Sequence, residues 1–268
     1  MAKLKKPLLF TLFILPAAII GGLFTQFFLL DTQSQETINQ AVAQVGSVDL
    51  LTVITVLQTV MIACFCGFVG YIITDKIGLI QKPFAFKKKG LAMALLFGAI
   101  LGIALGVDHF TSGALYPEIQ ASNIASFSVN GVMAGIFYGG IIEEVMMRLF
   151  FMSLVTLINW KVFFRKYTKE NIPQKVYVIA NILACLLFAV GHIPATIGIF
   201  GQLDLFIVVR CFVLNGVAGY LFGELFRKYG IGYAMTAHAV AHIVKFIFFA
   251  ILLSRILSGP KPYHIQSN

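Results

Sequence analysis

Charged residues are scarce in this sequence: 12% of its 268 residues are Asp, Glu, Lys or Arg, and 59% are hydrophobic. A soluble domain carries about a quarter charged residues. This amount of charge is too small to cover the surface of a soluble domain. Lipid must therefore solvate much of the surface. We therefore expect residues 1–268 to form a single integral membrane domain.

The sequence also lacks any nucleic-acid-binding motif, although its net charge is +9 and its pI is near 9.4. Its Lys and Arg residues lie in short loops between apolar runs and not in a basic stripe. Membrane lipid is therefore an expected partner, and nucleic acid is not. The cysteines have no zinc-ligand spacing and are predicted to be small buried hydrophobic residues. They are Cys64, Cys66, Cys185 and Cys211.

Seven apolar runs are long enough to cross a bilayer as helices, which takes about 20 residues. They are residues 8–30, 50–74, 91–107, 131–157, 176–200, 203–226 and 231–257. Gly191 and Pro194 interrupt the fifth run, and the last can form one helix or two. Short alternating segments typical of a β-barrel are absent. The sequence predicts an all-α membrane bundle of seven or eight transmembrane helices.

Two loops, residues 31–49 and 108–130, contain no Lys or Arg. The N-terminus and the loops that alternate with these two hold most of the basic residues. This alternation follows the positive-inside rule and predicts a cytoplasmic N-terminus. With no organelle signal in the sequence, it favours a prokaryotic plasma membrane.

Two glutamates and an arginine lie inside the fourth apolar run. An ionisable group at this depth costs a few kcal/mol, so it marks a functional site or an internal ion pair. Glu144 and Arg148 are four residues apart on one helical face and can neutralise each other. Glu143 has Met147 four residues on, and hence no such cation. Glu143 therefore suits a general base, although both acids could instead brace the bundle.

Three histidines lie in the later apolar runs. His192 stands one turn after Phe188, where alone it is typical of a helix-end hydrogen-bonding group. His238 and His242 share one helical face and can bind one metal or enter one polar cavity. No glutamate lies between them, so the His-Glu-x-x-His zinc motif is absent. Because such groups are too costly to face lipid, we expect them to share a cavity with the glutamates.

Three further ionisable residues, Arg210, Glu224 and Lys245, are expected to have structural roles. Arg210 can pair with a carboxylate elsewhere in the bundle. Glu224 can reach Arg227 or Lys228 at the cytoplasmic end of its helix.

Taken in order, these motifs resemble those of the CPBP family of CAAX proteases and bacteriocin-processing proteins, which includes the type II CAAX prenyl endopeptidases. The resemblance covers about residues 130–250. The motifs are Glu143-Glu144-Val-Met-Met-Arg148, Phe188-Ala-Val-Gly-His192 and His238-Ala-Val-Ala-His242. It implies an intramembrane protease in an eight-helix bundle, with a cavity open to the cytoplasm. At the position of His242 the family has Asn or Asp.

The resemblance also implies a role for each site residue. Glu143 would activate water with the help of His192, and Glu144 and Arg148 would position it. His238 and His242 would support the oxyanion of the tetrahedral intermediate. Because His242 replaces Asn or Asp, a zinc site is an open alternative to metal-free chemistry. The candidate zinc ligands are Glu143, His192, His238 and His242.

The expected function is therefore an endopeptidase acting on hydrophobic or lipid-modified peptides in the membrane. A bacteriocin-immunity or scaffold protein of the same fold, without catalysis, is the alternative. A transporter or proton relay is a third reading, because buried Glu and His residues also serve pumps. Transporters usually show paired halves with broken helices in corresponding positions, and no such repeat is visible in this sequence.

Overall fold

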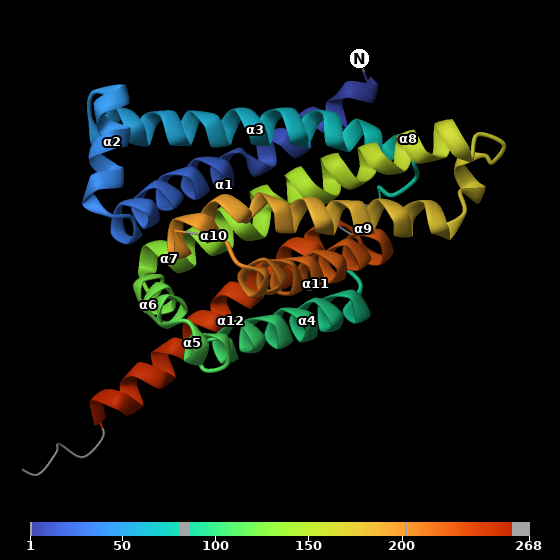
Figure 1. The fold of residues 1–268 in the computed structure, drawn as a ribbon. Coiled ribbons are helices and arrows are strands. Elements are labelled where there is room, and N and C mark those ends of the chain that lie inside the picture. The colour runs from blue at the N-terminus through green and yellow to red at the C-terminus, as the bar shows by residue number, and fades with distance from the viewer. Residues whose placement is uncertain (1, 81–85, 202, 259–268) are drawn as a thin grey trace, which may run out of the picture.

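The computed structural model describes residues 2–80, 86–201 and 203–258, and the regular structure within them is helical (Figure 1). Six helical segments in these ranges are long and apolar enough to cross a membrane. They are Leu4–Thr32, Val48–Lys76, Lys88–Leu115, Gln174–Gly198, Leu205–Tyr229 and Ile231–Arg255. The predicted all-helical class is confirmed, and the chain is a membrane protein with multiple transmembrane helices.

The long helices are joined by short helical segments and turns. The first part of the chain forms α1 (Ala2–Thr32), α2 (Gln35–Val45), α3 (Val48–Lys76), α4 (Lys88–Val107), α5 (Ser112–Leu115) and α6 (Pro117–Ala125). The central part forms α7 (Val129–Ala134), η1 (Gly135–Glu143), η2 (Val145–Met152), α8 (Ser153–Phe163) and η3 (Lys169–Asn171). The last part forms α9 (Gln174–Gly191), α10 (Ile193–Phe200), α11 (Leu205–Tyr229) and α12 (Ile231–Ser258).

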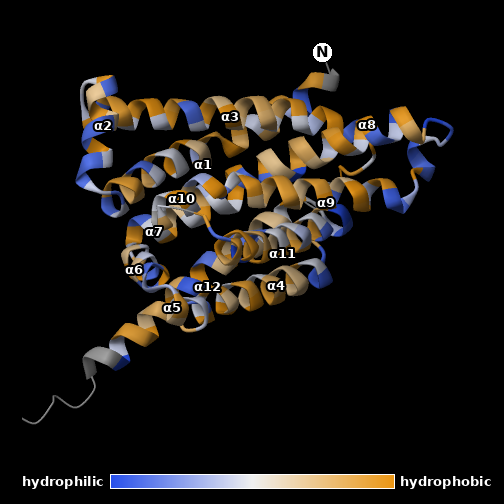
Figure 2. Ribbon diagram, in the orientation of Figure 1, coloured by the Kyte–Doolittle hydropathy of each residue, from blue (hydrophilic) through white to orange (hydrophobic). Residues whose placement is uncertain are grey.

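The helices pack as pairs around the segment that runs from α7 to α8. Helix α1 lies along α3, α9 along α11, and α4 along α12 (Figure 1). The central segment contacts α1, α3 and α12, so it is covered on several sides. Figure 2 shows apolar residues along the lengths of the helices and polar residues mainly at their ends and turns. This distribution suits helices that are surrounded by lipid.

Four of the described helices, α2, α3, α7 and α11, begin at a polar side chain that accepts a hydrogen bond from the first turn. Ser47 caps α3 through the Leu50 amide, at 3.1 Å. Ser128 starts α7 in the same way, and the Asp204 carboxylate caps α11. These side chains satisfy backbone donors that have no partner inside the helix.

Close packing of α4 against α12 depends on two glycines, Gly98 and Gly102, which lie one turn apart. A Cβ atom at Gly98 would lie 2.6 Å from the Ala237 carbonyl oxygen, and one at Gly102 would lie 2.6 Å from that of Ala241. Either contact is too short for any residue except glycine. The backbone of α12 is therefore fixed against α4 next to His238 and His242.

The predicted fourth span, residues 131–157, is helical throughout but is not a regular α-helix. Between α7 and α8 it widens into the π-helical η1 and η2, a distortion often found at functional sites. A hydroxyl of α3 supports the widened turns: Thr74 Oγ1 lies 2.9 Å from the Leu149 carbonyl oxygen and 2.8 Å from Ser153 Oγ. The apolar pattern of the sequence carries no signal for this change of helix type.

Two further details of the sequence prediction can be compared with the structure. The predicted interruption of the fifth run is confirmed, because α9 ends at Gly191 and α10 begins at Ile193. The last apolar run forms one helix, α12. All the cysteines are free thiols, and each of them except the half-buried Cys64 is buried, as predicted.

Candidate functional site

Two adjacent glutamates occupy the middle of the π-helical stretch. Glu143 is the last residue of η1, and Glu144 joins η1 to η2. The Glu144 side chain is 0% exposed, whereas that of Glu143 is 21% exposed and lines a cavity. The two neighbouring carboxylates therefore have different surroundings.

Glu144 contacts both an arginine of its own helical stretch and a histidine of α12. Its Oε1 atom lies 3.2 Å from Nη1 of Arg148, as the i, i+4 spacing predicted. The same oxygen lies 2.8 Å from Nδ1 of His238, which donates a hydrogen bond to the carboxylate. This bond fixes the direction of the imidazole ring and leaves its Nε2 atom pointing away from Glu144.

Arg148 is 1% exposed and is held by groups of α9 and α11. Its Nη2 atom donates to the Gly219 carbonyl oxygen at 3.0 Å. Its guanidinium lies 4.7 Å from the ring centre of Phe188 and 5.5 Å from that of Phe222, distances suited to cation–π attraction. Arg148 therefore links three helices beneath the glutamates.

His238 and His242 stack on one face of α12, with ring centres 5.2 Å apart and an interplanar angle of 19°. Nε2 of His238 lies 3.9 Å from Oε2 of Glu143. Gly139 of η1 faces both rings: a Cβ atom there would lie 3.1 Å from Nε2 of His242 and 3.3 Å from Nε2 of His238. The absence of a side chain at Gly139 thus lets both imidazoles reach the region beside Glu143.

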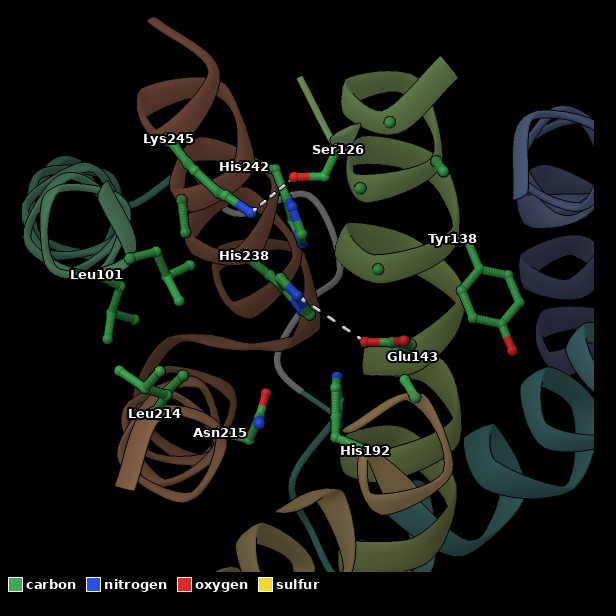
Figure 3. Close-up of a pocket in the computed structure, with 18 of the residues that line it drawn as sticks. Leu101, Ser126, Tyr138, Glu143, His192, Leu214, Asn215, His238, His242 and Lys245 are labelled. Atoms are coloured by element: carbon green, nitrogen blue, oxygen red, sulfur yellow. Dashed lines mark hydrogen bonds and ion pairs between the residues drawn. The ribbon is translucent and has the colours of Figure 1, made fainter. Parts of the chain in front are cut away.

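His192 stands at the break between α9 and α10. Its Nδ1 atom lies 2.8 Å from the Phe188 carbonyl oxygen and donates to it, because a carbonyl can only accept. Nε2 is then left as the acceptor of the neutral ring. Figure 3 shows the His192 ring directed toward the same region as Glu143 and His238.

A cavity of about 670 Å³ connects these side chains (Figure 3). Glu143, His192, His238 and His242 line it, and Glu144 and Arg148 lie buried behind the wall. Residues of α1, α4, η1, α9, α11 and α12 form most of the remaining, largely apolar, lining. The structure therefore brings all six predicted site residues to one place, four in the cavity and two behind it.

The same cavity contains polar residues that the sequence did not single out. Tyr138, Asn215 and Ser126 line it, and the Asn215 amide donates to the Cys211 carbonyl oxygen at 3.0 Å. Asn215 is a polar residue inside an apolar run, which was the available signal for it. Ser126 lies in a turn, and its position in the cavity depends on how the helices pack, which the sequence alone does not give.

The expected structural ion pairs are present. Arg210 pairs with Asp108 of the turn after α4, its Nε atom lying 3.1 Å from each carboxylate oxygen. Glu224 contacts Arg227 at 2.7 Å and Lys228 at 2.8 Å, as predicted. These contacts lie outside the glutamate–histidine cluster.

A second polar contact, between Tyr116 and Asp204, joins the turn before α6 to the start of α11. The hydrogen bond to Asp204 is the main cause that raises the pKa of the Tyr116 phenol. The pKa of Asp204 is lowered, first by the hydrogen bond from the Ile207 amide and then by that from Tyr116. This contact ties together two turns near one end of the bundle.

The zinc alternative can be tested against the geometry of the donor groups. Within the part of the chain that the structure describes, no three His, Cys, Asp or Glu side chains are grouped closely enough to hold one metal ion. Glu143, His192, His238 and His242 line one cavity but do not form a ligand set. The residues thus do not fit a zinc centre as they stand.

The fold and these contacts define a membrane protein with a carboxylate–imidazole cluster inside a helical bundle. Residues 124–244 match the family model described as "Type II CAAX prenyl endopeptidase Rce1-like". The chain therefore carries an Rce1-like domain of the type II CAAX prenyl endopeptidase family, within CPBP, and the predicted resemblance is confirmed. Comparisons with curated proteins and with solved structures gave no match.

Proposed function

We propose that this protein is an intramembrane endopeptidase in which Glu143 activates the water that hydrolyses a peptide bond. Its family is one of endopeptidases, which supports peptidase activity. One observation carries the proposal for this chain: Glu143 lines the cavity with its carboxylate 3.9 Å from His238 Nε2, whereas Glu144 is buried in an ion pair. The accessible carboxylate is the one that a water molecule can reach.

In the proposed reaction, Glu143 takes a proton from water while the water oxygen attacks the carbonyl carbon of the scissile bond. His192 assists, because its Nδ1 donates to the Phe188 carbonyl and its Nε2 is free to accept from the same water. When the intermediate collapses, the C–N bond breaks and Glu143 passes the proton to the leaving amine. A general base of this kind is worth about 10²- to 10⁴-fold in rate.

His238 and His242 support the negative charge on the carbonyl oxygen. Glu144 accepts the hydrogen bond from Nδ1 of His238, so a protonated His238 ring offers Nε2–H to the oxyanion. Arg148 balances the charge of Glu144 and keeps that carboxylate in place. A neutral His242 retains one N–H donor, which is sufficient for the support that Asn gives elsewhere in the family.

We also propose seven membrane spans with a cytoplasmic N-terminus, counting residues 131–157 as the span that contains the π-helical stretch. The cavity extends from Glu143 to Ser126, which lies in the loop without Lys or Arg. In this orientation the Ser126 end faces outward. The opening toward the cytoplasm that the resemblance implied stays a prediction.

The proposed substrates are hydrophobic or lipid-modified peptides in a prokaryotic plasma membrane. An apolar cavity at membrane depth favours a chain that is already in the lipid phase. Such a peptide can enter the apolar cavity from lipid without exposing its apolar surface to water, which would cost about 25 cal/mol per Å².

The test is cleavage of a quenched-fluorescent peptide library with hydrophobic or prenylated tails, by purified protein in liposomes. Glu143→Gln should lower the rate by about 10²- to 10⁴-fold. Glu118→Gln, which changes an exposed glutamate outside the site, is the matched control and should leave it unchanged. A chelator arm tests the metal-free chemistry, which predicts no loss.

Two results would change the proposal. Equal cleavage by wild type and Glu143→Gln would remove Glu143 from the role of base. If folded wild-type protein cleaves no member of a broad library, the non-catalytic immunity or scaffold function becomes the better description.

A further inference from the structure

A lysine lies in the same cavity as the candidate catalytic groups, one residue beyond the segment that matches the family model. Lys245 follows His242 by one turn of α12, and both line the cavity. Figure 3 shows its amine directed toward Ser126, across the cavity from α4. The side chain therefore points into the cavity.

The described residues provide Lys245 with no negative partner. Its Nζ atom donates to the neutral Ser126 hydroxyl at 3.3 Å, and no carboxylate in the described ranges forms an ion pair with it. Asp108 lies nearby, but both of its oxygens already accept from Arg210. A lysine amine inside a largely apolar cavity is costly unless a counter-charge or water meets it.

The two glutamates of the site lie beside other residues and form no ion pair with Lys245. Glu144 is buried against Arg148 and His238. Glu143 lies beside Nε2 of His238. The polar end of the cavity at Ser126 therefore carries an unbalanced positive charge, while its apolar walls suit a hydrophobic ligand.

We propose that Lys245 is a substrate-binding residue that recognises a carboxylate on the peptide held in this cavity. The proposal rests on the peptidase function above and adds a chemical requirement to its substrate. A charge-assisted N–H···O bond to a carboxylate would supply the missing counter-charge. The carboxylate can be the C-terminus of the peptide or an Asp or Glu side chain.

The spacing along α12 limits where that carboxylate lies. Lys245 is seven residues after His238, which is about 10 Å along a helix at 1.5 Å per residue. An extended peptide covers about 10 Å in three residues. The carboxylate is thus expected about three residues from the bond that lies beside His238.

The test measures binding as well as cleavage, so that the two proposals can fail separately. The probes are three fluorescent apolar peptides of one sequence: one with a C-terminal carboxylate, one with a C-terminal amide, and one amide with an internal Glu. Wild type, Lys245→Met and Lys245→Arg are compared by fluorescence anisotropy in detergent. Lys228→Met, on the exposed end of α11, is the control for the loss of one lysine charge.

Wild type should bind a carboxylate peptide about 10- to 100-fold more tightly than the plain amide. Lys245→Met should abolish that ratio, Lys245→Arg should retain most of it, and Lys228→Met should leave it unchanged. Whichever peptide shows the preference identifies the source of the carboxylate. Preference lost in Lys245→Met supports the proposal even if no peptide is cleaved, in which case only the peptidase function fails.

Equal wild-type affinity for all three peptides would overturn the proposal, and Lys245 would then serve only to hold Ser126. A preference that survives in correctly folded Lys245→Met would overturn it too.

Discussion

Replacing Arg148 by methionine should destabilise the protein strongly. The change keeps most of the side-chain volume but removes the charge from an ion pair whose members are 1% and 0% exposed. Glu144 would keep only its contact with His238, and its Oε2 atom already lacks a hydrogen-bond partner among the described residues. Breaking one side of a buried ion pair costs about 3–5 kcal/mol.

That cost can be read as a shift in melting temperature. For a domain of 150–250 residues, 1 kcal/mol corresponds to about 2–4 °C. Arg148→Met should therefore lower the melting temperature by about 6–20 °C. The buried thiols of Cys66, Cys185 and Cys211 provide the signal, because a thiol-reactive dye reaches them only when the helices separate.

Two variants make the experiment decisive. The double variant Glu144→Gln with Arg148→Met removes both charges and should regain part of the lost stability. Arg227→Met breaks the more accessible pair with Glu224 and should cost about 1 kcal/mol or less. An unchanged melting temperature in Arg148→Met, or a double variant as unstable as the single one, would refute the assignment of a tightly coupled buried pair.

Three further predictions concern the helix packing and the membrane orientation. Gly135→Ala should reduce cleavage at least about tenfold, because its methyl group would overlap an imidazole of α12, whereas Gly232→Ala, which faces open space, should not. Thr74→Val should lower the free energy of unfolding by about 1–3 kcal/mol in the dye assay, since it removes the buried hydrogen bonds that Thr74 makes with the Leu149 carbonyl oxygen and the Ser153 hydroxyl. In a cysteine-free background, an impermeant maleimide added to intact cells should label Gln40→Cys, while Lys166→Cys should react only after permeabilisation; the reverse pattern would invert the orientation.

The parts of the site that could be predicted from the sequence are those that depend on spacing within one helix. The i, i+4 rule placed Glu144 beside Arg148 and His238 beside His242, and both contacts are present. The cost of charge in lipid also predicted that Arg210 would find a carboxylate. The sequence could not identify Asp108 as that carboxylate. Asp108 lies 102 positions from Arg210 in the chain, and their pairing depends on how two helix ends meet.

The change from α- to π-helix could not be predicted from the sequence for a similar reason. The segment has the apolar composition of any membrane helix, and its widened turns are supported by Thr74 of another helix. The contact between the cavity residue Ser126 and Lys245 also joins distant parts of the chain. The role of Ser126 depends on α12, more than a hundred residues later in the chain.

Consecutive residues of a helix point in different directions, so separate surroundings for Glu143 and Glu144 require only packing that covers one carboxylate and not the other. The π-helical stretch and its neighbours supply it. Glu144 is covered by Arg148 and His238, while Glu143 lines the cavity, where Gly139 carries no side chain beside the two imidazoles. One carboxylate is thereby assigned to holding the cluster together, and the other remains accessible. A site with two acids in separate environments can assign positioning to one and proton transfer to the other.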